Sequence, residues 1–449
     1  MNAAPNAPVP IAHVLNTAGL GGVPEAAWHL LTRLSPERWE RHLYVMSPPA
    51  GSADHSEQAA EARAERLARF EAAGIRVSAS AAGDGALARQ GAFGDWLHRH
   101  RIALLHTHSY KPNLQARLQA AALGPVGLPL VAHYHNQYDN KWQADGSLSL
   151  DRRLAGRSAA LVACSTAVAR HVEDRLGLVA GRVLVVPNGV DGTRFRPAPD
   201  AAARLAARQG LAGWLGGSAD DPTLATQPWI ALVGRLCRQK GQDLLLRAAA
   251  RLRQAHPDAR WLLVGSADDT AHRDELLALA QALKLPADRV CLPGHLQDMP
   301  ALYQAIDLLV APSRWEGYGL MLVEAMACGT PIVASRAGAI PEVVGEDPTT
   351  DTIGMPGMPG MTGMTGADHP GVHGPAELVP VDDVDALAAA LDRQLRDPAL
   401  RAARGRAGPA RAAVLGWQHS ADRLDALYTE LLAQPRLAAD SNPASGGQP

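Results

Sequence analysis

Residues 307–335 read DLLVAPSRWEGYGLMLVEAMACGTPIVAS, and this stretch decides the fold. A short apolar run at 307–313 leads into a loop, and a longer apolar run at 320–329 ends at Gly329, before a second short run at 331–336. Short apolar runs bounded by turns predict buried strands, and the longer run predicts a buried helix that the glycine ends. A strand, a helix and a second strand in this order are the repeating unit of a parallel α/β sheet.

Two glutamates interrupt the apolar pattern of this unit. Glu316 follows the first predicted strand, and Glu324 lies within the predicted helix. Ligands of α/β proteins bind beyond the carboxyl ends of the strands, so both carboxylates are candidates for one binding site at that edge. The alternative is that Glu324 is a structural carboxylate with a buried partner, because carboxylates are almost never buried unpaired.

The same alternation of short apolar runs and longer Ala/Leu/Arg-rich stretches continues through most of the chain. Strands are predicted in a first series at 10–16, 41–46, 102–108, 128–135, 160–165 and 182–187, and in a second series at 228–234, 259–265, 289–294, 307–313 and 331–336. Continuous apolar strands that alternate with helices predict parallel sheets covered on both faces. The fold class is therefore α/β, with two doubly wound, Rossmann-like domains facing each other across a cleft.

The segments around the two series set the predicted domain limits. The first domain is predicted at 1–195, a linker at 196–228, and the second domain at 229–412. Within the second domain, the Gly/Met/Pro-rich segment 345–374 predicts a disordered insertion, because it cannot bury enough surface to offset its ordering entropy. A final helix is predicted at 413–436 and a disordered tail at 437–449.

Composition excludes several classes of protein. The 449 residues carry a formal net charge of -2 and only 4% aromatic residues, which argues against a nucleic acid partner. Neither a signal peptide nor an apolar run near the roughly 20 residues of a membrane span is evident. The four cysteines are scattered and form no CxxC pair, which favours reduced thiols in a cytoplasmic protein.

A second cluster of residues predicts a phosphate site. Arg235 and Lys240 follow the predicted strand at 228–234 and precede a predicted helix. Cations beside a helix N-terminus favour an anion, because free backbone N–H groups and the helix dipole act in the same direction. Gly19, Gly21 and Gly22 lie at another strand-to-helix turn, where backbone amides can approach an anion closely.

Taken together, these motifs resemble the retaining GT-B glycosyltransferases of family 4. The resemblance runs through LNTAGLGGV (15–23), HTHS (106–109), VAHYHN (131–136), VVPNGVDGTRF (185–195), VGRLCRQKG (233–241) and AGAIPEVV (337–344). Its most specific part is the pair Glu316 and Glu324, the second of which opens EAMACGTPIVAS. The resemblance implies a hexosyltransferase that moves a hexose from a nucleotide diphosphate sugar to an acceptor hydroxyl with retention.

The resemblance also implies roles for individual side chains. Glu316 matches the glutamate that contacts the donor sugar, and Glu324 matches the one that binds the ribose hydroxyls. Arg235 and Lys240 match the pair that neutralises the diphosphate as it leaves. With Arg235, Lys240 and Glu316, the residue expected at the reacting centre is His135, which matches a histidine at a strand end near the donor sugar.

Backbone groups complete the expected donor site. Gly317, Gly319 and Leu320, at the start of the predicted buried helix, would help to hold the phosphates. Gly21 and Gly22 would do the same from the first domain. The predicted final helix matches the one that crosses back to the first domain in this family.

Histidines at strand ends leave two alternatives open. His133 precedes His135 by two residues and shares its strand face, so either ring is a candidate for the position near the donor. His106 and His108 form a second H-x-H pair, and the four rings together allow a metal-dependent hydrolase as a rival function. No metal is expected in the transferase interpretation, because Arg235, Lys240 and helix N-termini stabilise the leaving group.

The remaining expectations concern partners and rivals. A nucleotide sugar is the expected donor and needs no further cofactor, and a sugar or lipid-linked glycan is the expected acceptor, in polysaccharide or glycolipid synthesis. The stretch 56–73 predicts a helix whose arginines alternate with acidic residues, which favours a solvated face over a membrane-binding one, and a loose contact with the inner face of a membrane is the alternative. A sugar-nucleotide epimerase or hydrolase, or a silent sugar-nucleotide binder, on the same fold are further rivals.

Overall fold

The fold comes from a computed structural model that describes residues 7–19, 21–46, 57–80, 86–125, 127–139, 143–144, 146–267, 270–346 and 374–434. The predicted insertion at 345–374 lies outside these residues except at its ends. The predicted tail at 437–449 lies outside them entirely.

The chain divides into two compact units. Unit 1 contains the residues up to Cys164, residues 169–186 and those from Gln418 onward, and unit 2 contains residues 165–168 and 187–417. Residues 187–195, which the sequence predicts in the first domain, belong to unit 2, where the backbone N–H of Val190 donates to Leu415 O at 2.8 Å. The predicted linker also belongs to unit 2 and contains a helix, α8 (Ala201–Ala212).

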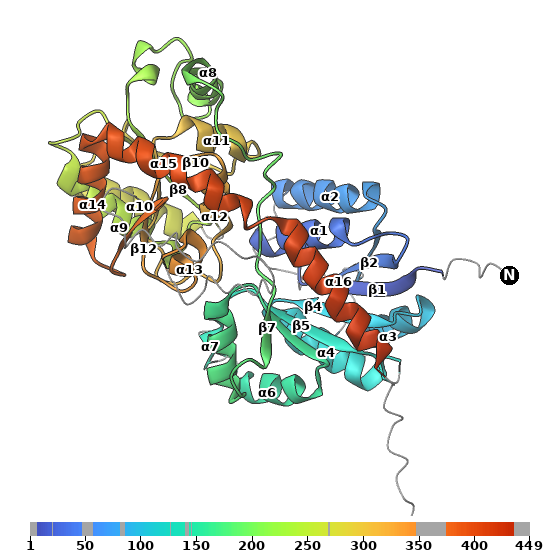
Figure 1. The fold of residues 1–449 in the computed structure, drawn as a ribbon. Helices are drawn as coiled ribbons and strands as arrows, with labels where there is room; N and C mark the ends of the chain where they lie inside the picture. Colours follow the sequence, from blue (N-terminus) through green and yellow to red (C-terminus); the bar gives the residue numbers. More distant parts are fainter. Residues whose placement is uncertain are drawn as a thin grey trace, which may run out of the picture. The chain divides into compact units, whose positions relative to one another are not determined.

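Unit 1 is built on a seven-stranded parallel sheet with the order β3-β2-β1-β4-β5-β6-β7 (Figure 1). Its strands are β1 (Val9–Leu15), β2 (Trp39–Val45), β3 (Arg76–Ala79), β4 (Leu104–His108), β5 (Leu130–Tyr134), β6 (Ala160–Ala163) and β7 (Val183–Val185). Its helices are α1 (Gly22–Arg33), α2 (Glu57–Ala72), α3 (Ala86–Arg99), α4 (Tyr110–Leu123), α6 (Leu148–Arg157), α7 (Thr166–Leu176) and α16 (Trp417–Ala433). Helix α16 lies beside β1 and β4, although it comes from the other end of the chain.

Unit 2 is built on a six-stranded parallel sheet with the order β10-β9-β8-β11-β12-β13. Its strands are β8 (Trp229–Val233), β9 (Arg260–Val264), β10 (Val290–Gly294), β11 (Leu308–Ala311), β12 (Ile332–Ser335) and β13 (Ala376–Val379). Besides α8, its helices are α9 (Gln242–Leu252), α10 (Thr270–Ala282), α11 (Met299–Ala305), α12 (Leu320–Ala327), α13 (Ile340–Val344), α14 (Val384–Arg396) and α15 (Pro398–Ala413).

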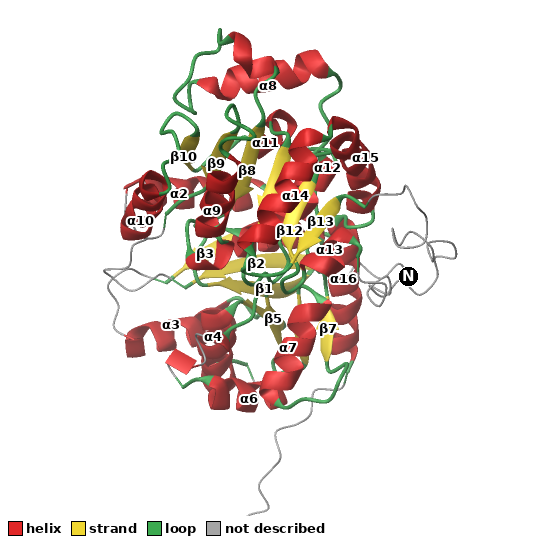
Figure 2. Cartoon of the chain, turned by 90° about the vertical axis from the view of Figure 1, so that its left-hand side faces the viewer, coloured by secondary structure: helices red, strands yellow, loops and turns green. Residues whose placement is uncertain are grey.

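Each sheet has its own hydrophobic core. In unit 2, leucines of α9 and α14 pack on the strands in one cluster, and Figure 2 shows these helices on one face of the sheet. In unit 1, separate clusters form around Phe93 and Trp96 and around Phe70. The expected α/β fold with two parallel sheets is therefore confirmed. None of the helices in the described ranges combines the length and the apolar character that crossing a bilayer requires.

The strand order defines one switch point in each sheet. Strands β1 and β4 are neighbours in unit 1, and β8 and β11 are neighbours in unit 2, because the chain winds outward from each pair in both directions. Ligands of doubly wound sheets bind beyond the carboxyl ends of the strands at such a point. The loops that follow these four strands carry most of the predicted site residues.

Candidate active site

The loop after β8 lies directly against the loop after β11. It contains a short 3-10 turn (Arg238–Lys240) and ends at Gly241, whose φ of 71° is left-handed and caps the start of α9. A Cβ at Gly241 would collide with the carbonyl oxygen of Pro312 in the loop after β11. Glycine is therefore required here by both its φ and its close approach to the neighbouring backbone.

Hydrogen bonds join the same two loops. The backbone N–H of Arg314 donates to Gln239 O at 2.8 Å, and the Gln239 side chain donates back to Trp315 O at 3.0 Å. The side chain of Gln242 donates to Arg235 O at 2.8 Å, which ties the start of the first loop to helix α9. The backbone on both sides of the predicted phosphate site is thus cross-linked.

The centre of the site is an ion pair between these loops. Lys240 Nζ lies 2.6 Å from Glu316 Oε2, and the side chains are only 13% and 9% exposed. Ser313 Oγ also donates to Glu316 Oε2, at 3.4 Å. The backbone carbonyl of Glu316 accepts from Ala339 N at 3.0 Å, so the following strand-to-helix turn fixes this residue as well.

Glu324 has a separate partner. The hydroxyl of Tyr303, on α11, donates to Glu324 Oε2 at 2.8 Å, while the glutamate itself is half-buried. Burial and this neighbouring carboxylate raise the pKa of Tyr303 well above its usual range, so the phenol stays a hydrogen-bond donor. The structure thus supplies a buried hydrogen-bond partner for Glu324, as the alternative of a structural carboxylate requires.

The other predicted residues of unit 2 lie on the same loops. Arg235 is exposed on the loop that carries Lys240. Gly319 caps the start of α12 with a left-handed φ of 91°, and Leu320 is the first residue of that helix. Gly317 O accepts a hydrogen bond from Ser165 Oγ at 2.7 Å. The structure therefore brings the predicted donor residues of unit 2 to adjacent strand ends.

In unit 1, the predicted glycines lie at the switch point. Gly21, with a φ of 145°, is the N-cap of α1, and Gly22 is its first residue. Both are exposed, and they follow β1 by a short loop in which Gly19 N donates to Thr17 Oγ1 at 3.0 Å. They are placed to present the first backbone amides of α1 at that edge.

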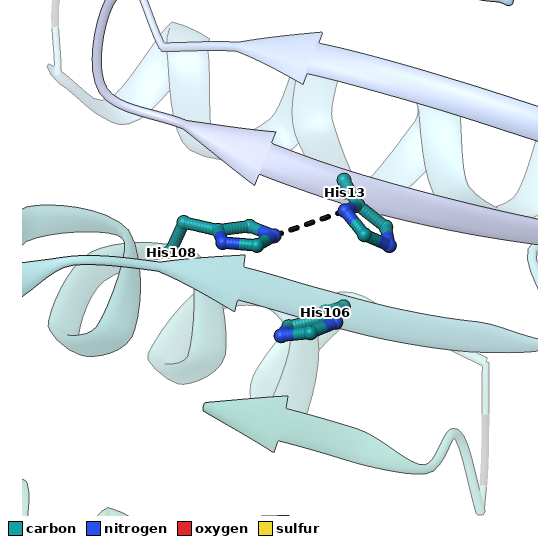
Figure 3. Close-up of side chains that lie close together, drawn as sticks. All are labelled: His13, His106 and His108. Atoms are coloured by element: carbon teal, nitrogen blue, oxygen red, sulfur yellow. Dashed lines mark hydrogen bonds between the residues drawn. The ribbon is translucent and has the colours of Figure 1, made fainter. Parts of the chain in front are cut away.

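The predicted histidines of unit 1 form one buried cluster with His13. His108 Nε2 lies 2.9 Å from His13 Nδ1, and His108 Nδ1 lies 3.0 Å from His135 Nε2. Figure 3 shows His13, His106 and His108 side by side, with the contact between His108 and His13 as a dashed line. His133 stacks on His135 with ring centroids 4.0 Å apart.

Burial keeps these imidazoles neutral. It lowers the pKa of His13 and of His135 to about 3. For His106, His108 and His133, burial and the neighbouring rings lower the pKa well below its usual value. Neutral imidazoles can accept a hydrogen bond or ligate a metal. Two overlapping triads have one nitrogen per ring within 4.8 Å of the others in the same triad: His13/His106/His108 and His108/His133/His135.

Sequence reasoning missed three members of these sites. His13 lies in a predicted strand and was not among the candidate histidines, although its side chain must share a face with alternate residues of that strand. Tyr428 of α16 is hydrogen-bonded to His13 Nε2 at 2.8 Å and to His106 Nδ1, and Tyr303 holds Glu324. Each tyrosine contacts a residue on a different helix or strand, and the periodicity of the sequence does not reveal such contacts.

Comparisons with known proteins agree across the chain. Residues 20–194 match a family model described as Glycosyltransferase Family 4, and residues 227–397 match one described as Glycosyl transferases group 1. The D-inositol 3-phosphate glycosyltransferase of Segniliparus rotundus is 31% identical over 75% of this chain and 68% of its own length. That of Thermobifida fusca is 32% identical over 74% of this chain and 71% of its own length.

Solved structures share the fold. Anabaena HepE in complex with UDP and glucose superposes with a TM-score of 0.72 at 20% identity, covering 94% of this chain and 100% of that one. Sucrose-phosphate synthase from Thermosynechococcus elongatus gives 0.69 at 22% identity, covering 95% of this chain and 99% of that one. The GT-B fold expected from the sequence is thereby confirmed.

Proposed function

The chain belongs to the group 1, family 4 glycosyltransferases, and we propose that it transfers a hexose from a nucleoside diphosphate sugar to an acceptor hydroxyl with retention. The observation that carries this proposal is the Lys240–Glu316 pair, with Arg235 on the same loop, at the switch point of unit 2. A basic pair beside a helix N-terminus suits a diphosphate, and a carboxylate beside it suits sugar hydroxyls.

The barrier to glycosyl transfer is charge separation. As the bond between the anomeric carbon and the diphosphate oxygen breaks, negative charge grows on the diphosphate and positive charge on the sugar. Arg235 and Lys240 stabilise the leaving diphosphate by preorganised electrostatics, and the fixed loop backbone means that little reorganisation is needed. The reaction so described uses no metal.

The acceptor step completes the proposal. The acceptor oxygen forms the new bond to the anomeric carbon on the face that the diphosphate leaves, and the diphosphate oxygen takes the acceptor proton. Glu316 orients the donor sugar, which contributes positioning. His135 is the ring proposed to lie near the donor sugar, with His133 as the alternative. Glu324, which accepts a hydrogen bond from the Tyr303 hydroxyl, binds the ribose hydroxyls.

The names of similar proteins suggest the substrates to test. The HepE structures contain UDP, UDP with glucose, or UDP-glucose, and the curated relatives are named D-inositol 3-phosphate glycosyltransferases, so we take inositol 3-phosphate as the first acceptor to test. A lipid-linked glycan is the other acceptor class, and it would place the enzyme at the inner face of a membrane, with residues 56–73 in loose contact.

The first experiment identifies the donor. Thermal melting of the purified chain is followed with UDP, GDP and ADP and with their sugars, because a ligand that binds the folded state raises the melting temperature by mass action. We expect one nucleotide series to stabilise the chain, and the absence of any shift would count against a nucleotide-sugar site.

The second experiment identifies the reaction. The selected donor, labelled in its sugar, is incubated with inositol 3-phosphate, with simple sugars and with lipid-linked glycans, in the presence of a chelator. Transfer of label to an acceptor supports the proposal, and the anomeric configuration of the product tests retention. Free labelled sugar or an isomerised donor as the main product would instead indicate a hydrolase or an epimerase.

A further inference from the structure

Five buried histidines gather on one face of the sheet of unit 1. His13 of β1 pairs in register with His106 of β4, and His108 of β4 pairs with His133 of β5. Because alternate residues of a strand point to the same face, His108 and His135 extend the same row on their strands. His135 is 8% exposed and the other four rings are fully buried.

Several nitrogens of this cluster have no hydrogen-bond partner among the described residues. Both ring nitrogens of His133 are in this state, and so are Nε2 of His106 and Nδ1 of His135. A buried polar atom without a partner costs about 1–3 kcal/mol, so four such atoms in one cluster need an explanation. An ion bound beside His133 would supply a partner for one nitrogen of that ring, which has none on either side among the described residues.

The nitrogens of His108, His133 and His135 lie within 4.8 Å of one another, and those of His108 and His135 are already 3.0 Å apart. A tetrahedral ion with bonds of about 2.0–2.1 Å to nitrogen holds two ligand atoms about 3.4 Å apart, which small ring rotations would reach. We propose that His108, His133 and His135 bind one divalent transition-metal ion of the zinc class.

The hydrogen bonds decide between this triad and the overlapping one. His13 and His106 both bond to the hydroxyl of Tyr428, so their facing nitrogens are already satisfied. By contrast, His133 has no partner on either nitrogen within the described part of the chain. The unsatisfied lone pairs therefore concentrate on the side of His133 and His135.

The second triad forms the outer shell of the proposed site. With the ion on His108 Nδ1, His108 Nε2–H donates to His13 Nδ1, and His13 Nε2–H donates to Tyr428 Oη. The Tyr428 hydroxyl then donates to His106 Nδ1, so the protons of His108 Nε2, His13 Nε2 and Tyr428 each have an acceptor, and His106 carries its own proton on Nε2. Metal-binding histidines typically donate their second N–H to such a partner, which fixes their tautomer and orientation.

The ligand set indicates the class of metal. Imidazole nitrogens suit Zn²⁺, Cu²⁺ and Ni²⁺, whereas Mg²⁺ and Ca²⁺ prefer oxygen ligands. Three protein ligands leave one position of a tetrahedral ion for water or another small ligand. The proposed transfer reaction does not need this ion, and an ion here would occupy Nε2 of His135.

The test measures metal binding by the full chain after the purification tag and all metal have been removed. A Zn²⁺ titration against a chromophoric chelator should give one equivalent with a Kd of about 1 µM or tighter. His133→Phe keeps a ring but loses both nitrogens, and we expect it to weaken Zn²⁺ binding by at least about 100-fold. Loss of an outer-shell partner typically lowers metal affinity about 10–100-fold, and loss of a ligand itself should lower it further. His13→Phe, which removes the acceptor for His108, should weaken it by about 10–100-fold.

His42→Phe is the matched control, because His42 is also fully buried in unit 1 but is hydrogen-bonded to Glu40 at 2.8 Å. Binding should be unchanged in this variant, and an equal loss there would overturn the assignment. A loss in His106→Phe with normal binding in His133→Phe would overturn it too, in favour of the other triad.

A spectroscopic measurement on the unmodified chain covers variants that fail to fold. Co²⁺ in a four-coordinate site has intense visible absorption, and we expect this spectrum at one equivalent. Binding well below one equivalent, or the weak spectrum of hydrated Co²⁺, would refute the site whatever the variants do. None of these readouts depends on glycosyl transfer, so they stand or fall separately from the proposed function.

Discussion

Lys240 is the residue in which structure and chemistry are hardest to separate. Its ammonium is nearly buried and paired with Glu316, so its removal leaves a buried carboxylate without its cationic partner. Breaking such a pair from one side destabilises a protein by about 3–5 kcal/mol. Arg235 is exposed on the same loop, so its replacement tests the diphosphate site with a smaller structural effect.

We therefore predict that Arg235→Ala lowers turnover by about 100-fold or more, the usual effect of losing one preorganised donor to a developing charge, with little change in melting temperature. Lys240→Ala should lower turnover as much and should also lower the melting temperature. Arg238→Ala is the control, because Arg238 is an exposed arginine on the same loop. Steady-state kinetics with the identified donor are the measurement, and near-normal turnover of Arg235→Ala would contradict the assignment.

Glu324 can be tested without disturbing Tyr303. Glu324→Gln keeps an oxygen that accepts from the Tyr303 hydroxyl but removes the charge offered to the ribose. A hydrogen bond to a charged group contributes about 1.5–3 kcal/mol, so we expect the nucleotide to bind about 10- to 100-fold more weakly by calorimetry. Tyr303→Phe is the companion variant and should have the smaller effect. Unchanged affinity in Glu324→Gln would leave this residue a purely structural carboxylate.

Glu25 makes unit 1 sensitive to acid. Burial raises the pKa of Glu25, but the hydrogen bond from His29 and the charges of Arg66 and Arg69 outweigh it and lower that pKa from 4.5 to about 2. The unfolded chain therefore binds a proton at higher pH than the folded chain does. The stability from Glu25 is present above pH 4.5 and is lost as the pH falls towards 2.

We expect Glu25→Gln to cost up to about 3 kcal/mol of unfolding free energy at pH 7 and much less near pH 2, measured by urea unfolding. Glu37→Gln is the control, because Glu37 is exposed and, within the described ranges, its side chain is hydrogen-bonded to Ser35 at 2.7 Å and to no other residue. Parallel pH profiles for the Glu25 variant and the unmodified chain would show that the ion pairs with Arg66 and Arg69 contribute nothing.

At the scale of elements, strands with continuous apolar runs were predictable, and two strands at sheet edges, β3 and β13, were not. The run LLVA of β11 and the run IVAS of β12 are buried at every position, so hydrophobicity alone locates them. Strand β3 reads RVSA at an edge of the first sheet and is half-buried or exposed throughout, and β13 reads AELV at an edge of the second sheet. Each of these two runs contains a polar residue and buries less of its surface, which leaves a weaker signal in the sequence.

The site residues show the same division. The placement of Glu316, Lys240 and Arg235 beyond neighbouring strands was predictable, because each follows a clear strand within a few residues. Tyr303 and Tyr428 were not, because each meets its partner only after distant segments have packed. Local patterning specifies which edge of a sheet carries a residue, and tertiary packing decides which side chain it meets.

The turn that supports Glu316 gives a prediction at this scale. Gly338 has a left-handed φ of 52°, and a Cβ there would collide with the carbonyl oxygen of Glu316. Gly338→Ala must therefore move the loop that carries the carboxylate, and a displacement of about 1 Å can lower a rate by about 100-fold. Gly216→Ala is the matched control, since Gly216 has a φ of 73° with open space around it.

Both glycine variants should lose about 1–2 kcal/mol of stability from the left-handed backbone of a non-glycine residue. We expect a loss of turnover of about 100-fold only in Gly338→Ala, measured with saturating donor. Equal turnover in the two variants would mean that the position of the Glu316 loop does not limit the reaction.

At the scale of the molecule, the last helix belongs to the first sheet. Asp425 of α16 accepts hydrogen bonds from Arg38 and from Trp39 Nε1, both at 2.6 Å, and the fully buried Tyr428 reaches His13 of β1. Unit 1 is thus closed by residues more than 200 positions after β7, and its stability depends on the end of the described chain.

Because α16 packs on the first sheet, a destabilising substitution in this helix should lower the stability of unit 1. Tyr428→Ala removes a buried ring, a change of the kind that costs about 3–5 kcal/mol, and it also leaves His13 and His106 without their shared hydroxyl. Amides of β1 and β4 should exchange with deuterium at least about 100-fold faster, because their protection reports the stability of the unit that contains them.

Glu430→Ala, at an exposed position of the same helix, should leave exchange unchanged. The strands β8 and β11 of unit 2 should keep their protection in both variants, since their own core lies among α9, α14 and the second sheet. Faster exchange in β8 and β11, with β1 and β4 unaffected, would contradict the assignment of α16 to unit 1.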